Sequence, residues 1–267
     1  MRIVATDHAG NEGSFEASLI VDNTPPVFGP LDDINANAAT ADGTTVNFTV
    51  TATDALATNV SVQCTPASGS TFPLGTTNVM CTATDQAGNI ASASFDVVVT
   101  DTTAPIINAA SLPSLAQAEA TGAAGASVAY TLPTASDNVD PNPGVNCVPA
   151  SESTFAIGTT TVTCTATDSR NNSSVATFTV TVTDTTGPVF ANVPSNFIQA
   201  ATDANGATVS YAEPTATDSV DGNVAVRCDP FSGSLFPITT TTVTCTATDS
   251  HNNTSTATFT VTVADLV

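Results

Sequence analysis

The sequence lacks lysine and tryptophan and carries few positive charges of any kind. Three arginines stand against 24 aspartates and glutamates, which gives a formal net charge of −21 at pH 7. A field of this sign repels the phosphates of nucleic acids and of anionic lipid surfaces. We therefore expect no nucleic-acid partner and no direct insertion into a membrane. The absence of lysine also excludes covalent crosslinks between lysine and asparagine side chains.

Groups that catalyse reactions near neutral pH are equally scarce. The two histidines, His8 and His251, lie in turn segments near opposite ends of the sequence. General-base and nucleophilic catalysis need a base and its partner within hydrogen-bond reach of each other. The sequence therefore predicts a protein that is not an enzyme and that requires no cofactor.

Long apolar runs are missing as well. A run such as Val97 to Val99 falls far short of the roughly 20 residues that cross a bilayer. Met1 is not followed by a basic and then an apolar segment, so an export signal or anchor is expected outside this sequence.

What the sequence has in abundance is repetition. One motif recurs three times, about 80 residues apart. It reads Asp22-Asn-Thr-Pro-Pro26, Asp101-Thr-Thr-Ala-Pro105 and Asp184-Thr-Thr-Gly-Pro188. Between these motifs, apolar residues alternate with threonines and other small or polar residues, as at Phe178, Val180 and Val182. Such alternation is typical of strands with one buried face.

Short strands separated by Pro, Gly, Asn and Asp turns predict two-sheet sandwiches, because one short sheet cannot bury its apolar face alone. The predicted fold is all-β, with tandem immunoglobulin-like or fibronectin III-like β-sandwiches in a linear array. Complete domains are expected at residues 22–100, 101–183 and 184–267. Residues 1–21 match only the end of a period and are expected to form the C-terminal hairpin of an incomplete preceding repeat. We therefore expect the natural protein to continue before Met1.

Six cysteines fall into three pairs with one constant spacing. Both cysteines of each pair share a strand face with apolar residues, which predicts one disulfide inside each repeat: Cys64–Cys81, Cys147–Cys164 and Cys228–Cys245. A zinc site is the alternative, but neither histidine is placed to complete four ligands with any pair. Disulfides predict an oxidising compartment and hence a secreted or cell-surface protein.

Two segments beside the first pair of cysteines carry a family resemblance. They read Cys64-Thr-Pro-Ala-Ser-Gly-Ser-Thr-Phe-Pro-Leu-Gly-Thr-Thr and Cys81-Thr-Ala-Thr-Asp-Gln-Ala-Gly-Asn, and an Asp-Thr-Thr-x-Pro linker follows. With Ala216-Thr-Asp-Ser-Val-Asp-Gly222, they resemble the hyalin repeat (HYR) family; Ala52-Thr-Asp54-Ala-Leu-Ala departs from its pattern. The resemblance implies an immunoglobulin-like fold, an extracellular location and a role in adhesion or matrix assembly, with no enzymatic activity.

The aspartates are the one set of residues that suggests a binding site. In an immunoglobulin-like sandwich, the entering chain meets the B–C and F–G loops at one pole. Linker and loop aspartates are therefore expected to converge at two junctions between repeats. The two predicted sets are Asp101, Asp137, Asp140 and Asp168 at the second junction, and Asp184, Asp218, Asp221 and Asp249 at the third.

Two interpretations of these aspartates stay open. Several carboxylates together with carbonyl oxygens suit Ca²⁺, which takes oxygen ligands. Alternatively, each aspartate only caps its own turn through the backbone. The first junction offers only Asp22, Asp54 and Asp85 and is the weaker candidate.

Glycosylation motifs of the form Asn-x-Ser/Thr occur at several positions, including Asn47 and Asn59. Four of them lie in predicted turns where a glycan would be accommodated: Asn171, Asn172, Asn252 and Asn253. Such short motifs also arise by chance in a chain rich in Asn and Thr.

Three functions are compatible with this organisation. The first is a structural region of an extracellular surface or filament protein, a rigid stalk or fibre whose partners are neighbouring repeats and identical subunits. The alternative is a binding module that recognises a glycan or protein through its pole loops, although aromatic residues make up only 5% of the chain. An ice-facing array of threonines is a weaker third, because threonine is simply a good exposed strand residue.

Overall fold

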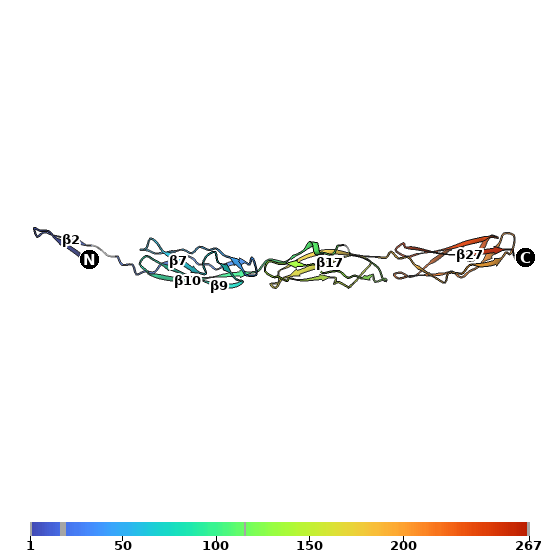
Figure 1. Cartoon of the computed structure of the whole chain (residues 1–267), viewed down its shortest axis with the longest axis horizontal. Helices are drawn as coiled ribbons and strands as arrows, with labels where there is room; N and C mark the ends of the chain where they lie inside the picture. The colour runs from blue at the N-terminus through green and yellow to red at the C-terminus, as the bar shows by residue number, and fades with distance from the viewer. Residues whose placement is uncertain (1, 17–19, 115, 266–267) are drawn as a thin grey trace. The chain divides into compact units, whose positions relative to one another are not determined.

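The computed structural model describes residues 2–16, 20–114 and 116–265 (Figure 1). The chain forms two compact units. The first contains residues 1–105 with 137–142 and 168–172, and the second contains residues 106–136, 143–167 and 173–267. Two loops from the middle of the sequence therefore pack with the first repeat.

Residues before the first linker form an antiparallel hairpin of β1 (Arg2–Thr6) and β2 (Glu12–Glu16). Every residue of both strands is exposed. Asp7 closes the turn, because its Oδ1 accepts hydrogen bonds from the backbone amides of Ala9 and Asn11, both at 2.9 Å. The hairpin expected for residues 1–21 is thus present at 2–16, while residues 1 and 17–19 lie outside the described part of the chain.

The first repeat is a two-layer sandwich. Figure 1 labels three strands of its larger sheet, whose order is β4 (Ile34–Asn37), β10 (Ile90–Thr100), β9 (Gly75–Thr84) and β7 (Ser61–Thr65). Within that sheet β4 runs parallel to β10, and the other neighbours are antiparallel. The opposite layer consists of the pair β3 (Val27–Phe28) and β6 (Ala52–Thr53) and the pair β5 (Thr44–Thr45) and β8 (Thr71–Phe72).

The second repeat has the same layers. Its larger sheet has the order β12 (Ala116–Glu119), β18 (Ser173–Thr183), β17 (Gly158–Thr167) and β15 (Gly144–Val148). The opposite layer pairs β11 (Ile106–Ile107) with β14 (Ala135–Ser136) and β13 (Ala126–Ser127) with β16 (Thr154–Phe155). A short 3-10 helix, η1 (Ala109–Ser111), follows β11.

The third repeat has a longer second layer. Its larger sheet has the order β20 (Phe197–Ala200), β27 (Thr254–Ala264), β26 (Thr240–Thr248) and β24 (Val226–Asp229). The opposite layer contains β19 (Val189–Ala191), β22 (Thr215–Asp218) and β23 (Gly222–Val224), and the pair β21 (Ala207–Val209) and β25 (Ser234–Phe236). The prediction of tandem all-β immunoglobulin-like sandwiches is confirmed.

The last strand of each repeat supplies the centre of its core. In β10, Phe95, Val97 and Val99 are 5%, 0% and 1% exposed. The equivalent residues of β18 and β27 are buried in the same way. Each such side chain contributes roughly 1.5–3 kcal/mol through burial. In β18 and β27, the threonines between these residues face the other side of the sheet, as the alternation predicts.

Each sandwich contains one disulfide in its larger sheet. The bonds are Cys64–Cys81, Cys147–Cys164 and Cys228–Cys245, and no free cysteine is found in the described part of the chain. The two cysteines of each bond lie directly opposite each other on neighbouring antiparallel strands. Since β7, β15 and β24 are edge strands, the bond attaches an edge strand to its sheet.

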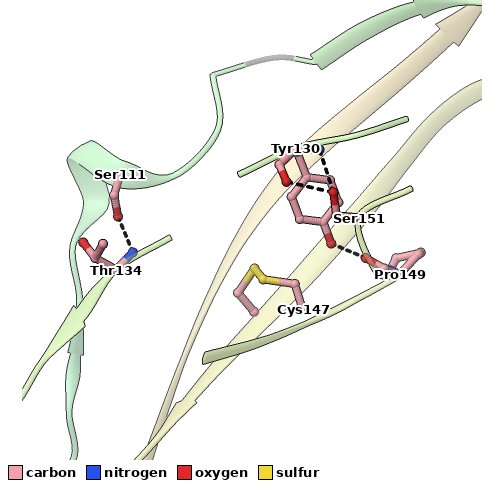
Figure 2. The surroundings of a disulfide bond; sticks show 7 residues. Ser111, Tyr130, Thr134, Cys147, Pro149 and Ser151 are labelled. Atoms are coloured by element: carbon pink, nitrogen blue, oxygen red, sulfur yellow. Dashed lines mark hydrogen bonds between the residues drawn. A yellow bond between two sulfur atoms is a disulfide. The ribbon is translucent and has the colours of Figure 1, made fainter. Parts of the chain in front are cut away.

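A tyrosine packs beside the disulfide of the second sandwich (Figure 2). The amide of Tyr130 donates to Ser151 Oγ, and that hydroxyl donates to the Tyr130 carbonyl, both at 2.8 Å. The Tyr130 hydroxyl donates to the carbonyl of Pro149. The ring meets Phe178 edge-on, with centroids 5.0 Å apart.

The other two repeats test which parts of this arrangement recur. In the third, Tyr211 makes the same bonds with Ser232 and with the Pro230 carbonyl. In the first, Ser68 bridges the backbone of Phe48, but phenylalanine has no hydroxyl to donate. The serine bridge is therefore common to all three repeats, and the hydroxyl bond adds to it in two.

Replacing both Cys147 and Cys164 by alanine is expected to destabilise the second sandwich by about 3 kcal/mol, because the disulfide no longer restricts the unfolded chain. Urea unfolding measures the loss, with Thr163→Ala on the exposed face of β17 as the control.

Peptide mapping without reductant should give the three bonds within repeats. A bond between cysteines of different repeats would contradict the modular organisation.

Tyr130→Phe is expected to destabilise the second sandwich by about 1–2 kcal/mol, because the Pro149 carbonyl loses its donor while the ring packing stays. The control is Phe48→Leu in the first sandwich, which changes packing without changing any hydroxyl. Amide hydrogen exchange in β15 and β17 reports the loss repeat by repeat. Unchanged protection in Tyr130→Phe would show that the hydroxyl contributes nothing to stability.

Candidate functional site

Each linker is held by an asparagine that ends a tight turn of the following repeat. The three turns begin with an aspartate and end with an asparagine four positions later, at residues 85–89, 168–172 and 249–253. In the second, Asp168 Oδ1 accepts from the amides of Arg170 and Asn172 at 2.8 and 2.9 Å. Asp168 Oδ2 accepts from the Asn172 side chain at 2.8 Å. One aspartate thus organises the whole turn.

The asparagine side chain also reaches the linker. Asn172 Nδ2 donates to the backbone carbonyl of Asp101 at 3.2 Å, and Asn253 Nδ2 donates to that of Asp184 at 3.2 Å. Asn89 makes the same bond to the carbonyl of Asp22, at 3.3 Å. The turn and the linker aspartate are therefore tied together at all three junctions.

These hydrogen bonds keep the turn aspartates ionised although they are buried. Burial by itself opposes ionisation of Asp168, but the hydrogen bonds from Asn172 and the turn amides lower its pKa below the ordinary value. The same balance of burial against hydrogen bonds lowers the pKa of Asp85 and of Asp249. Each junction therefore contains a fixed negative charge.

The preceding repeat holds the same linker from its other side. Asn37 Oδ1 accepts from the amide and the hydroxyl of Thr102 at 2.9 and 3.0 Å, and Asn37 Nδ2 donates to Thr103 Oγ1 at 2.9 Å. These bonds join the end of β4 to the residues that follow β10.

Glu119 occupies the equivalent place at the end of β12. Its Oε1 accepts from the Thr185 amide and the Thr186 hydroxyl, both at 2.8 Å, and its Oε2 accepts from the Thr185 hydroxyl at 2.7 Å. The bonds from the hydroxyl and amide of Thr185, followed by that from Thr186, lower the pKa of Glu119 from 4.5 to about 2.

One apolar side chain per loop completes the junction. Val139 packs against the core of the first repeat, and Val220 packs against that of the second. Beside Val139, Asn138 Nδ2 donates to the carbonyls of Ala38 and Ala39 at 3.2 and 3.1 Å. The corresponding residue of the first repeat, Leu56, is 52% exposed.

Carboxylates gather at each of these junctions. The first acidic cluster is Asp22, Asp54 and Asp85; the second is Asp101, Asp137 and Asp168; the third is Asp184, Asp221, Asp249 and His251. Within each cluster, one ligand atom per residue lies within 4.8 Å of all the others. Linker and loop aspartates therefore lie close together at all three junctions.

Unsatisfied oxygen atoms distinguish the second and third clusters. Three buried side-chain atoms of the described residues lack a hydrogen-bond partner: Asp101 Oδ2, Asp137 Oδ2 and Asp184 Oδ2. All three belong to these clusters. Asp101 and Asp184 are only 6% and 7% exposed. Since a buried carboxylate oxygen without a donor is costly, these oxygens fit a divalent cation as their partner.

Two aspartates expected in the sites lie outside the clusters. Asp140 Oδ2 accepts from the Ser169 amide at 2.8 Å, so this residue braces one loop against the other. Asp218 Oδ1 accepts from the amides of Val220 and Asp221 at 2.7 and 3.1 Å, so it caps its own loop. Asp218 therefore matches the turn-capping alternative, and Asp140 combines both roles, because its Oδ1 also accepts from the Asn142 amide at 2.9 Å.

His251 was not expected in any site, since the sequence suggests only a variable turn residue. Its Nδ1 lies 3.1 Å from Asp184 Oδ2 and 3.7 Å from Asp221 Oδ2. His251 therefore faces the linker aspartate, and the equivalent position of the other two turns holds arginine at 170 and alanine at 87. A position-by-position comparison of the three turns could have singled out His251 in the sequence, because the other turns have no metal-ligating residue there.

The four candidate glycosylation sites fall into two classes. Asn172 and Asn253 use their side-chain nitrogens within the junctions. Asn171 and Asn252 are exposed, with φ of 68° and 69°. The exposed pair is therefore better placed to accept a glycan.

None of the helices in the described part of the chain has the length and apolar character that a bilayer crossing requires.

Comparison with solved structures finds cadherin repeats, at low similarity. Mouse cadherin-23 EC22-24 aligns with a TM-score of 0.36 and 16% identity, over 91% of this chain and 100% of that one. Drosophila N-cadherin EC1-4 aligns with a TM-score of 0.33 and 16% identity, over 98% of this chain and 82% of that one. The fold described above rests on the strands of this chain alone.

Sequence comparison is more specific. The hyalin of Lytechinus variegatus is 35% identical over 247 residues, 88% of this chain and 46% of that protein. The hyalin of Strongylocentrotus purpuratus is 35% identical over 248 residues, 88% of this chain and 20% of that protein. The chain thus spans less than half the length of either relative. The HYR domain profile matches residues 21–99, 100–182 and 183–263, and the chain therefore belongs to the HYR domain family.

Proposed function

We propose that this chain is a non-enzymatic structural region of an extracellular surface or filament protein, and that it acts as a rigid stalk or fibre in adhesion or matrix assembly. The modules are residues 22–100, 101–183 and 184–267. One observation carries the proposal: the linkers between these modules are hydrogen-bonded from both sides. A linker that served only as a flexible tether would need no such bonds.

The contacts around Thr185 illustrate the mechanism. The carboxylate of Glu119 binds this residue from the preceding module, and Asn253 of the following module binds the adjacent Asp184 carbonyl. Val220 adds an apolar contact with the core of the preceding module. Bending at the junction would break several of these contacts together, and this favours one fixed angle between modules.

Ca²⁺ is the cation that we propose for the second cluster. Asp101, Asp137 and Asp168 offer only oxygen ligands. In proteins, Ca²⁺ completes its coordination shell with backbone carbonyls and water. Without a cation, three carboxylates within 4.8 Å of one another repel. With the cation bound, that repulsion becomes attraction between the linker and two loops, so the junction tightens.

The extracellular assignment rests on separate observations. Three disulfides are typical of an oxidising compartment, and the relatives named hyalin share the repeat. Because the chain spans only part of those relatives, we propose partners of the simplest kind, namely neighbouring repeats of the same protein and identical subunits. A net charge of −21 suits a medium rich in divalent cations, which screen repulsion between such subunits.

Millimolar Ca²⁺ is expected to raise the melting temperature and to lengthen the particle in solution scattering, relative to EDTA. A ligand at about 100 times its dissociation constant stabilises the folded form by about 2.7 kcal/mol. Asp101→Asn should remove most of the response of the second junction, since it neutralises a buried carboxylate of the cluster. Asp32→Asn, an exposed carboxylate outside the clusters, is the control with the same charge change. Equal responses of both variants would remove Ca²⁺ from this junction.

The hydrogen bonds that Glu119 accepts from Thr185 and Thr186 should depend on pH only in strong acid. Because the folded-state pKa is lowered from 4.5 to about 2, the stabilisation is fully present above pH 4.5 and is lost as the pH falls through about 2. The amide proton shift of Thr185, followed by NMR, should titrate near that lower value. In Glu119→Gln the acid titration should disappear, whereas Glu152→Gln, an exposed control, should leave it unchanged. A titration of the Thr185 amide near pH 4.5 would show that these hydrogen bonds do not stabilise the ionised Glu119 carboxylate.

A further inference from the structure

We propose that the third acidic cluster binds a divalent transition-metal cation, such as Zn²⁺, through the imidazole of His251 and the carboxylates of Asp184, Asp221 and Asp249. This inference rests on the proposed role of cations at the junctions and extends it. The second and third clusters would then bind different classes of metal.

The geometry around His251 fits metal ligation. Its Nδ1 lies 3.1 Å from Asp184 Oδ2 and 3.7 Å from Asp221 Oδ2. Zinc ligands lie about 2.0–2.2 Å from the metal, so neighbouring ligands of a tetrahedral site are roughly 3.3 Å apart. The observed distances bracket that separation. Asp249 contributes the fourth ligand atom, within 4.8 Å of the other three.

A second, independent observation points to a missing partner. The side chain of Asp184 is 0% exposed, and its Oδ2 accepts no hydrogen bond. The Nδ1 of His251 lies 3.1 Å from this oxygen and pairs with it only when Nδ1 carries a proton; a neutral ring with its lone pair on Nδ1, the form that ligates a metal, leaves the oxygen without a donor. The neighbouring hydroxyl of Ser250 is already bound to Asp221 Oδ1 at 2.6 Å. A cation between the imidazole and these carboxylates would satisfy the orphaned oxygen.

The turns themselves explain why the two clusters should differ. The position of His251 is held by Arg170 in the second turn, and a guanidinium cannot ligate a cation. The second cluster is left with oxygen ligands only, which suit Ca²⁺. Adding an imidazole nitrogen shifts the preference towards Zn²⁺ and related metals, for which histidine is a common ligand. One residue therefore changes the class of metal.

His251→Ala is the sharpest test. Alanine occupies the equivalent position, Ala87, in the turn at residues 85–89, so the substitution should leave the turn intact. In the metal-free 267-residue chain, Zn²⁺ should bind with one high-affinity equivalent by calorimetry, and Co²⁺ should give visible absorption bands of an imidazole–carboxylate site. The variant should lose at least about tenfold in affinity, the loss that even outer-shell changes cause.

Two further variants make the result specific. Asp221→Asn should weaken Zn²⁺ binding without touching the histidine. His8→Gln should leave binding unchanged, since His8 lies in the exposed hairpin and glutamine holds its place at position 86. Melting temperatures measured in EDTA should agree among all variants, which shows that each one folds.

The outcomes separate this inference from the proposed function. Zn²⁺ binding that survives His251→Ala would overturn the transition-metal site, as would wild-type protein that binds no Zn²⁺ or Co²⁺. If Ca²⁺ still stabilises the second junction in that case, the proposed role of Ca²⁺ stands and only this inference fails. Binding of Zn²⁺ that depends on His251 supports the site even if Ca²⁺ has no effect.

Discussion

The hydrogen bond from a turn asparagine to the backbone of a linker aspartate is the contact on which each junction depends. Asn172, for example, ties the turn of Asp168 to the carbonyl of Asp101. The Asp101 side chain lies at the same pole, where one oxygen each of Asp101, Asp137 and Asp168 lie within 4.8 Å of one another. Its Oδ1 accepts from the Thr103 amide at 3.0 Å, and its Oδ2 is the orphaned oxygen.

The sandwiches that carry these junctions have small cores. Each core centres on one phenylalanine and two valines of the last strand, with the other strands packed around them. Small domains gain little from burial, and a disulfide on the edge strand compensates by restricting the unfolded chain. The serine bridge and the tyrosine hydroxyl add local rigidity beside that bond. These features hold the loops in place, and the loops position the charged groups.

Variation at a single turn position then gives the junctions different chemistry. The scaffold of aspartate, asparagine and linker is the same at all three, but the residue two places after the turn aspartate is Ala87, Arg170 or His251. In the third turn, this residue faces the linker carboxylate, with His251 Nδ1 3.1 Å from Asp184 Oδ2. Alanine leaves the cluster open, arginine cannot ligate a metal, and histidine adds a nitrogen ligand. Tandem repeats can thus differ in metal preference without any change in fold.

The sequence by itself determined the all-β fold, the repeat and the pairing of cysteines, because these depend on periodicity and spacing, which are local and repeated three times. It also indicated which aspartates gather at the poles, since the order of strands in a sandwich brings those loops together. Only the tertiary structure decided which of them share a cluster. Asp137, Asp140, Asp218 and Asp221 all accept hydrogen bonds from loop amides, but only Asp137 and Asp221 also offer an oxygen close to the linker carboxylate. The tertiary structure alone revealed His251. Whether a turn side chain points towards a linker depends on backbone geometry, which residue type does not encode.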